Sequence, residues 1–322
     1  MPIKTIPKFS AFVIFMALVS ISSAACHSSV VGDGEPPSFD KEKSAYEGPK
    51  IIGKIQSDEI TESSGIAASL CQPDVIWTHN DSGDGAFIFA INSAGKHLGT
   101  WKVQNSQNTD WEDIAGFKDG KGKCYLYIGE IGNTNNKDQR AEHKIYRVAE
   151  PAVRPPDSNS TRKNPLQTEP VATLAFSYPD SRQDAETLMV HPMTGDIYVV
   201  TKHRSKPASV YKLKPVFDAP AVKAEKISDI TVPAIPNGFL TGGEIAPDGK
   251  RVIICDYFAG YEFVLPDGAS NFDEIWKQKP VVVELGDRKQ GEAIGYSADG
   301  LSILATSEGK HAPIIQAKVR MP

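Results

Sequence analysis

Short apolar runs recur along residues 50–320, and turns rich in Gly, Asp, Asn and Pro separate them. No segment keeps the 3.6-residue period of an amphipathic helix, so the pattern predicts strands. Five runs start alike, with a polar residue followed by small and apolar residues, and most close in a turn such as Asp-Gly. They are ESSGIAAS at Glu62, EDIAGFKDG at Glu112, ETLMVHPMTG at Glu186, TGGEIAPDG at Thr241 and EAIGYSADG at Glu292. The chain is therefore predicted to consist of repeated units.

Each unit continues with a second strand that ends in polar residues, such as VIWTHND in the first unit and DIYVVTKH in the third. A third strand follows in every unit, and a fourth follows in all but the last. The fifth unit ends with its third strand, APIIQAKVR, and the N-terminal run PKIIGKI is expected to supply its fourth strand. Four-stranded units arranged in a ring and closed by both ends of the chain predict an all-β fold, a five-bladed β-propeller over residues 49–322.

A six-bladed ring is the alternative, in which two blades would have been merged into one. The interval from Glu112 to Glu186 is the longest between repeats. Most of its excess is the run EPAVRPPDSNSTRKNPLQTEP, and its Pro, Ser and Asn content predicts a loop rather than strands.

The N-terminus forms a separate segment. Two lysines precede the apolar run FSAFVIFMALVSISSAAC, which predicts a secretory signal peptide over residues 1–25. The ending SSAAC resembles a bacterial lipoprotein signal and makes Cys26 the lipidated residue; simple cleavage without lipidation and an uncleaved anchor helix are the alternatives. Residues 26–48 are polar and predict a flexible tether. We therefore expect an exported protein, periplasmic or on the cell surface, that contacts the membrane only through a lipid on Cys26.

The net charge bears on the class of binding partner, and the cysteines bear on disulfide formation. Removing residues 1–25 takes away two lysines and no acid, which leaves 33 basic and 40 acidic residues and a net charge of about −7. This charge, without a Lys/Arg stripe, argues against nucleic acid as a partner, and we expect a monomer. Cys71 and Cys124 each precede a strand, and export would permit a disulfide between them. Cys255 lies inside the apolar run RVIICDYF and is expected to be a buried thiol.

The repeated acids point to a metal site. The first strand of every propeller blade lines the central channel, so a residue repeated at its start converges on the axis. Clustered carboxylates repel one another, and calcium, which takes about 6–8 oxygen ligands, would relieve this repulsion. Zinc fits less well, because few His and no Cys stand at ligand spacing. The alternative is that the acids cap strand ends or bridge blades. The predicted calcium ligands are Glu62, Asn80, Asp81, Glu112, Glu186 and Glu292.

Two stretches carry a family resemblance. ESSGIAAS…VIWTHNDSGDGAFIFAINSAG and DWEDIAGF…CYLYIGEIGN resemble exported bacterial propellers of the phytase-like or SdiA-regulated type, and more distantly gluconolactonase and strictosidine-synthase propellers. The resemblance spans roughly residues 50–320 and implies a propeller that often binds calcium and in some members hydrolyses phosphoesters or lactones. It places Glu62, Glu112, Glu186 and Glu292 at channel-facing acid positions. The run EIGNTNN stands where these families have Asp-Ile-Gly-Asp-Asn, so the ligand set does not transfer in detail.

Two functions follow from these residues. The sequence contains no G-x-S-x-G elbow, P-loop or H-E-x-x-H motif. This absence, with no basic cluster for a highly charged phosphate, favours a non-catalytic calcium-binding propeller that holds a small molecule, glycan or protein at its ring face. The alternative is a metal-dependent hydrolase, a phosphoesterase or lactonase working at the central channel. Its candidate catalytic residues are Lys202, His203 and Glu130, which lie at the ends of second strands.

Overall fold

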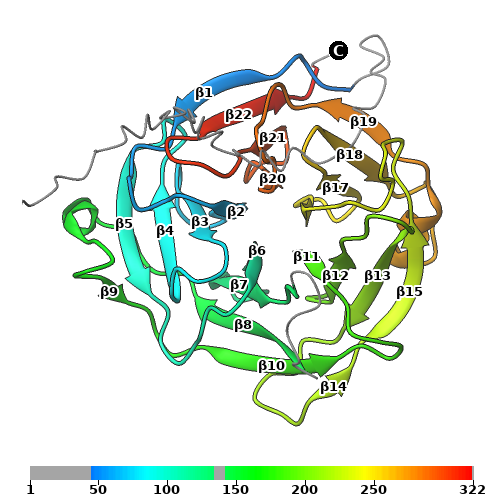
Figure 1. Ribbon diagram of the computed structural model, residues 1–322, viewed down its shortest axis with the longest axis horizontal. Helices are drawn as coiled ribbons and strands as arrows, with labels where there is room; N and C mark the ends of the chain where they lie inside the picture. The colour runs from blue at the N-terminus through cyan, green and yellow to red at the C-terminus, as the bar shows by residue number, and fades with distance from the viewer. Residues whose placement is uncertain (1–44, 134–141, 321–322) are drawn as a thin grey trace, which may run out of the picture. The chain divides into compact units, whose positions relative to one another are not determined.

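The computed structural model describes residues 45–133 and 142–320. Five largely antiparallel sheets stand around a central channel, as Figure 1 shows, and this confirms the five-bladed propeller. The predicted signal peptide, Cys26 and most of the tether lie outside the described residues. Within the described residues, no helix combines the length and apolar character that a membrane span requires.

Each blade runs from an innermost first strand to an outer fourth strand, and blades are numbered in chain order. The first strands are β2 (Ser63–Ala68), β6 (Trp111–Lys118), β11 (Ala185–Val190), β16 (Gly242–Ile245) and β20 (Ile294–Tyr296). The second strands are β3 (Ile76–Asn80), β7 (Cys124–Glu130), β12 (Ile197–Thr201), β17 (Arg251–Cys255) and β21 (Ser302–Ala305). The third strands are β4 (Phe87–Ile91), β8 (His143–Ala149), β13 (Ala208–Leu213), β18 (Ala259–Val264) and β22 (Pro313–Lys318). The fourth strands are β5 (His97–Lys102), β10 (Ala172–Ser177), β15 (Glu225–Ile230), β19 (Val281–Glu284) and β1 (Lys50–Lys54).

The two ends of the ring meet in blade 5. Strand β1 pairs antiparallel with β22, with Lys50 opposite Gln316, as the sequence predicted. Residues 45–48, assigned above to the tether, also belong to this blade. Tyr46 is buried, bridges to Val319, and donates a hydrogen bond from its hydroxyl to Glu262 Oε1 at 2.5 Å. The tether prediction was therefore wrong at this boundary, because a single buried tyrosine has no periodic pattern to reveal it.

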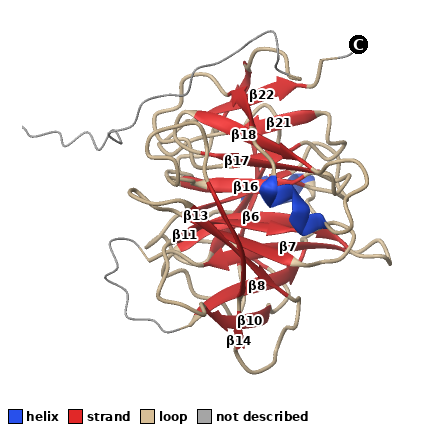
Figure 2. Cartoon of the chain, turned by 90° about the vertical axis from the view of Figure 1, so that its right-hand side faces the viewer, coloured by secondary structure: helices blue, strands red, loops and turns tan. Residues whose placement is uncertain are grey.

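Segments inserted before the fourth strand cover the preceding blade. The run after Glu150, predicted as a loop only, contains the 3-10 helix η2 (Pro155–Asn159) and the short strand β9 (Leu166–Gln167), which pairs in parallel with β5 of blade 1. Strand β14 (Val222–Lys223) of blade 3 pairs in the same way with β10 of blade 2. The 3-10 helix η3 (Phe272–Lys277) of blade 4 packs against β15 of blade 3, and Figure 2 shows a helical segment outside the strands on this side. Each outer edge covered in this way is protected from unwanted pairing.

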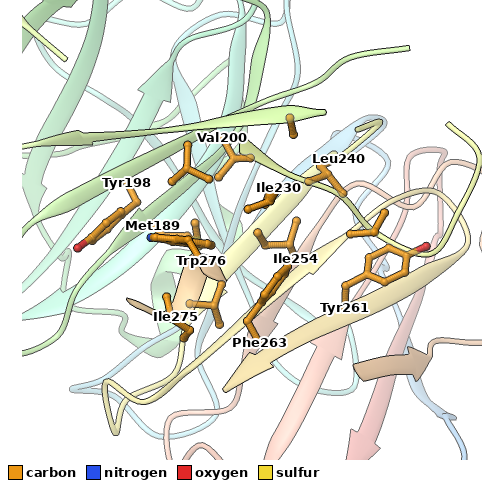
Figure 3. Close-up of a cluster of buried hydrophobic side chains, with 14 of the residues drawn as sticks. Met189, Tyr198, Val200, Ile230, Leu240, Ile254, Tyr261, Phe263, Ile275 and Trp276 are labelled. Carbon is orange, nitrogen blue, oxygen red and sulfur yellow. The ribbon is translucent and has the colours of Figure 1, made fainter. Parts of the chain in front are cut away.

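The core lies between neighbouring blades. Figure 3 shows one such layer, where Met189, Tyr198 and Val200 of blade 3 face Ile254 and Phe263 of blade 4. Every residue of β12 is buried, because adjacent blades cover both faces of an inner strand. Inner strands therefore read as continuous apolar runs instead of alternating ones.

The cysteines divide as the sequence suggested. Cys71, in the turn after β2, forms a disulfide with Cys124 at the start of β7, which links blade 1 to blade 2. Cys255 is a buried free thiol, and burial raises its pKa to about 11. This thiol is therefore protonated and unreactive at neutral pH.

Candidate functional site

A β-bulge occurs in the first strand of the first three blades, at the repeated acid in blades 2 and 3 and two residues after Glu62 in blade 1. The register of the first strand shifts between Ser63 and Gly65 in blade 1, between Trp111 and Asp113 in blade 2, and between Ala185 and Thr187 in blade 3. The extra residues are Ser64, Glu112 and Glu186. A bulge leaves its extra residue unpaired and redirects its side chain, so the same device acts at the same point of three blades.

Five carboxylates from blades 1, 2 and 3 converge at this end of the channel. Oxygens of Asp81, Asp110 and Glu112 all lie within 4.8 Å of one another, and so do oxygens of Glu112, Asp184 and Glu186. Glu112 belongs to both groups and joins them. We call these five residues the mouth cluster. Glu112, Glu186 and Asp110 are buried, and Asp81 and Asp184 are partly buried.

Burial and mutual repulsion raise the pKa values of three members of the mouth cluster, Asp81, Glu112 and Glu186. Burial raises the pKa of Asp81 to about 8, and the negative charges of Glu186 and Glu292 add to the effect. Burial likewise raises the pKa of Glu186 to about 8, although the nearby Lys202 ammonium opposes the shift. The pKa of Glu112 lies well above its ordinary value, through burial and the charges of Glu186, Asp81 and Asp110. A divalent cation would replace protons on these carboxyls and remove the repulsion.

Lys202 connects the mouth cluster to blade 5. Its Nζ lies 3.0 Å from Glu186 Oε1 and 3.7 Å from Glu292 Oε1, and its side chain is 14% exposed. The ring centroids of Phe239 and Tyr257 lie 4.8 and 5.6 Å from the same nitrogen. Tyr257 also donates a hydrogen bond to Glu292 Oε1 at 3.3 Å. Lys202 therefore places a positive charge beside the mouth cluster, on the side that faces blades 4 and 5.

Glu292 is not one of the five carboxylates of the mouth cluster; it lies beside Lys202, and its charge acts on both Asp81 and Glu186. Burial raises its pKa to about 8; Lys202 opposes the shift, and the carboxylate of Glu308 adds to it. Of the ligands predicted for calcium, Asp81, Glu112 and Glu186 belong to the mouth cluster. Glu292 does not, and Lys202 Nζ lies between it and Glu186.

The structure does not bring Glu62 and Asn80 into the cluster. Glu62 is exposed, and its backbone bridges to Glu308. The amide of Asn80 accepts hydrogen bonds from the backbone N–H groups of Thr61 and Glu62 and donates to Glu59 O at 2.8 Å. Both residues join segments of the fold. Asn80 was predicted as a ligand because a strand tip was expected to face the axis, but its side chain bonds to the neighbouring backbone and to Asp84 Oδ2 at 2.7 Å.

His203 points away from Lys202, its neighbour. Its backbone N–H donates to Gly238 O at 2.7 Å, and the charges around its ring belong to Lys206, Asp229, Lys226 and Asp180. Burial, helped by Lys206, lowers the pKa of His203 to about 4. The catalytic role predicted for His203 does not fit this position, because consecutive side chains of an extended segment face opposite ways.

Glu130 holds the segment before β6, which carries Asp110 of the mouth cluster. Its carboxylate accepts the backbone N–H groups of Thr109 and Asp110, each at 2.9 Å. These bonds hold the segment that carries Asp110, so Glu130 is a positioning residue.

Two further acids, Asp113 and Glu244, lie among the first strands. Asp113 accepts the backbone N–H groups of Ile114 at 2.8 Å, Leu188 at 2.9 Å and Gly243 at 3.4 Å, from blades 2, 3 and 4. Glu244 of blade 4 accepts the backbone N–H of Tyr296 in blade 5. Burial raises the pKa of Asp113 well above its usual range and that of Glu244 to about 8. The blade-bridging alternative describes these two residues.

The ligand prediction missed Asp110 and Asp184. Each lies two residues before a bulged glutamate, so consecutive blades carry the same Asp-x-Glu pattern, Asp110/Glu112 and Asp184/Glu186. The side chain of Asp184 also accepts the backbone N–H of Asn133 at 2.7 Å, which ties the loop after β7 to blade 3. The repeated pair of acids was the available signal.

The comparisons with known proteins identify no family. No protein-family model matches the chain, and no curated protein matches it. Among solved structures, the chain is similar to a gluconolactonase from Xanthomonas campestris, described as important in glucose secondary metabolic pathways. The identity is 11% and the TM-score 0.44, and the alignment covers 90% of this chain and 98% of the gluconolactonase.

Proposed function

We propose that this protein is an extracytoplasmic calcium-binding propeller that holds a ligand at the mouth of its channel. The observation that carries the proposal is the sharing of Glu112 between two groups of carboxylate oxygens, each within 4.8 Å. Calcium accepts several carboxylates at flexible geometry, which suits five acids drawn from three blades. Asp81, Asp110, Glu112, Asp184 and Glu186 would hold it.

The disulfide supports the proposed location. Cys71 and Cys124 lie 53 residues apart and form a covalent link between two blades. Such bonds persist in oxidising compartments outside the cytoplasm. The export and lipidation proposed from residues 1–26 agree with this chemistry.

A metal-dependent hydrolase is the second candidate, and Glu292 is the observation that favours it. This carboxyl lies next to the mouth cluster, its pKa is raised to about 8, and Tyr257 and Lys202 hold it. A carboxyl with a pKa near neutrality is suited to exchange protons with a substrate or water. Bound calcium would supply polarisation of a substrate oxygen, and Glu292 would hold or release the proton beside it.

Calcium titration followed by thermal unfolding tests the proposed function. Because calcium binds the folded state, a concentration of 100 times Kd should stabilise the wild type by about 2.7 kcal/mol. Glu186→Gln should lose most of this gain, whereas Glu292→Gln, which lies on the far side of Lys202, should lose less. Glu62→Gln removes an acid outside the cluster and is the matched control. A wild-type melting temperature that does not respond to calcium would overturn the metal site and the hydrolase with it.

A further inference from the structure

A cavity lies near Lys202, on the side of blades 4 and 5. It has a volume of about 600 Å³ and lies between the turn after β17 and the segment before β20. Its lining residues are Tyr257, Phe258, Gly286, Asp287, Arg288 and Lys289. Tyr257 lines the cavity and also contacts the residues beside the mouth cluster. Its hydroxyl donates a hydrogen bond to Glu292, and its ring lies next to the Lys202 ammonium. A ligand in this cavity would therefore lie near Lys202 and Glu292.

Arg288 gives the cavity a buried positive charge. The residue is 9% exposed, and its Nη2 donates to the backbone carbonyl of Asp256 at 2.8 Å. Its Nη1 lies 3.5 Å from Thr306 O, and its Nε is buried without a hydrogen-bond partner. No carboxylate of the described residues lies within 4.0 Å of this guanidinium. The nearby Asp256 carboxylate is committed to the backbone N–H groups of Phe258 and Ala259 and to a tyrosine hydroxyl.

A buried cation that lacks a counter-ion is unfavourable in a folded protein. Such groups are normally paired, and Arg288 is one of the residues that line the cavity. Lys289 adds a second, exposed positive charge to the same lining, against one negative charge from Asp287. The guanidinium is suited to planar or tetrahedral oxyanions, which it contacts through several N–H groups.

We infer that this cavity binds the anionic group of a small organic ligand, a carboxylate or a phosphate, through Arg288 and Lys289. The aromatic rings of Tyr257 and Phe258 would contact the rest of the ligand, and a cation held by the mouth cluster would lie beyond Tyr257 and Lys202. This inference rests on the proposed function in one respect, since it names the class of ligand that the ring face holds. The anion site itself requires no metal.

Isothermal titration calorimetry of the full chain with three probes that share a phenyl ring tests the inference. Benzoate carries a carboxylate, phenyl phosphate carries a phosphate, and benzyl alcohol is neutral. At constant ionic strength, we expect at least one anion to bind at least tenfold more tightly than benzyl alcohol, and the tighter anion identifies the preferred group. Arg288→Gln should abolish this preference. Lys289→Gln changes an exposed residue and should weaken anion binding by about fivefold.

Lys279→Gln is the matched control, because it removes the same charge from an exposed position outside the cavity lining. Equal weakening by Lys289→Gln and Lys279→Gln, equal binding of all three probes, or no binding of either anion would overturn the inference. If Arg288→Gln does not fold, the comparison of Lys289→Gln with Lys279→Gln still decides. Anion binding without any calcium response would leave this site standing and reject the metal site; a calcium response without anion binding would do the reverse.

Discussion

Glu112 and Asp113 are neighbours in sequence, and both are buried carboxyls with raised pKa values, yet their surroundings differ. Asp113 accepts backbone N–H groups from three blades. Among the residues that the structure describes, the Glu112 carboxylate accepts no hydrogen bond and faces other carboxylates. First strands have no neighbour on their inner edge, so Asp113 satisfies donors that the fold leaves open. The contrast teaches that a raised pKa alone does not identify a functional acid; its partners do.

The largest expected effect separates these two residues by stability. Asp113→Asn replaces one accepting oxygen by an amide nitrogen and should lower the free energy of unfolding by about 2–3 kcal/mol, with or without calcium. Glu112→Gln should leave stability in chelator unchanged or raise it, because an amide cannot ionise and repel the neighbouring carboxylates, and should abolish most of the calcium response. Urea unfolding of both variants measures this. Similar destabilisation by Glu112→Gln in chelator would show that it, too, bridges the blades.

The next effect is a dependence of stability on pH that calcium should suppress. The pKa values of Asp81 and Glu186 are about 8 in the folded protein, so the folded state binds more protons than the unfolded state above pH of about 4. This contribution is complete below the ordinary carboxyl pKa and is lost as the pH rises towards 8. In chelator, each of these two carboxyls should lower stability by about 1.4 kcal/mol per pH unit across most of the range from pH 5 to 8.

Calcium should flatten that curve, since the cation takes the place of the protons. Asp113 and Glu244 also have raised pKa values, but their share should persist in calcium because no cation reaches them. Urea unfolding at several pH values in calcium and in chelator provides the measurement. Parallel curves under the two conditions would mean that the mouth cluster does not exchange protons for calcium.

The smallest effect uses a pair of glycines and changes no charge. A Cβ atom on Gly132 would lie 1.9 Å from Glu112 Oε1, so Gly132→Ala should displace that carboxylate and weaken calcium binding by about fivefold, or about 1 kcal/mol. A Cβ on Gly65 would lie 2.6 Å from the backbone nitrogen of Ile114 and 2.8 Å from Asp113 Oδ1, so Gly65→Ala should lower stability instead. Calcium titration and thermal unfolding of both variants distinguish the outcomes. Loss of calcium affinity in Gly65→Ala but not in Gly132→Ala would reverse the assignment of the two regions.

The blades were readable from the sequence because repeats impose their own register. The repeated polar starts predicted the four strands of each blade, including the closing strand at Lys50, but not the short strands β9 and β14. Side-chain direction was less accessible. A one-residue change of register moves a side chain to the other face, which is why Lys202 enters the cluster and His203 does not. Bulges shift the register at Glu112 and Glu186, two acids of the mouth cluster, and Asp184 lies two residues before the second bulge. Asn80 was misread because strand tips carry polar residues for backbone capping as well as for binding.

The closing strand has a consequence for the synthesis of the chain. Strand β1 lies near the start of the ring and its partner β22 at the end, so this pairing has a very long sequence separation. At a translation rate of about 5–20 residues per second, β1 emerges on the order of ten seconds or more before β22. During that time an unpaired apolar strand is a target for aggregation. Strand β1 reads KIIGK, with Lys50 and Lys54 at its two ends. The charges of these two lysines would oppose aggregation of the unpaired strand until the last blade forms.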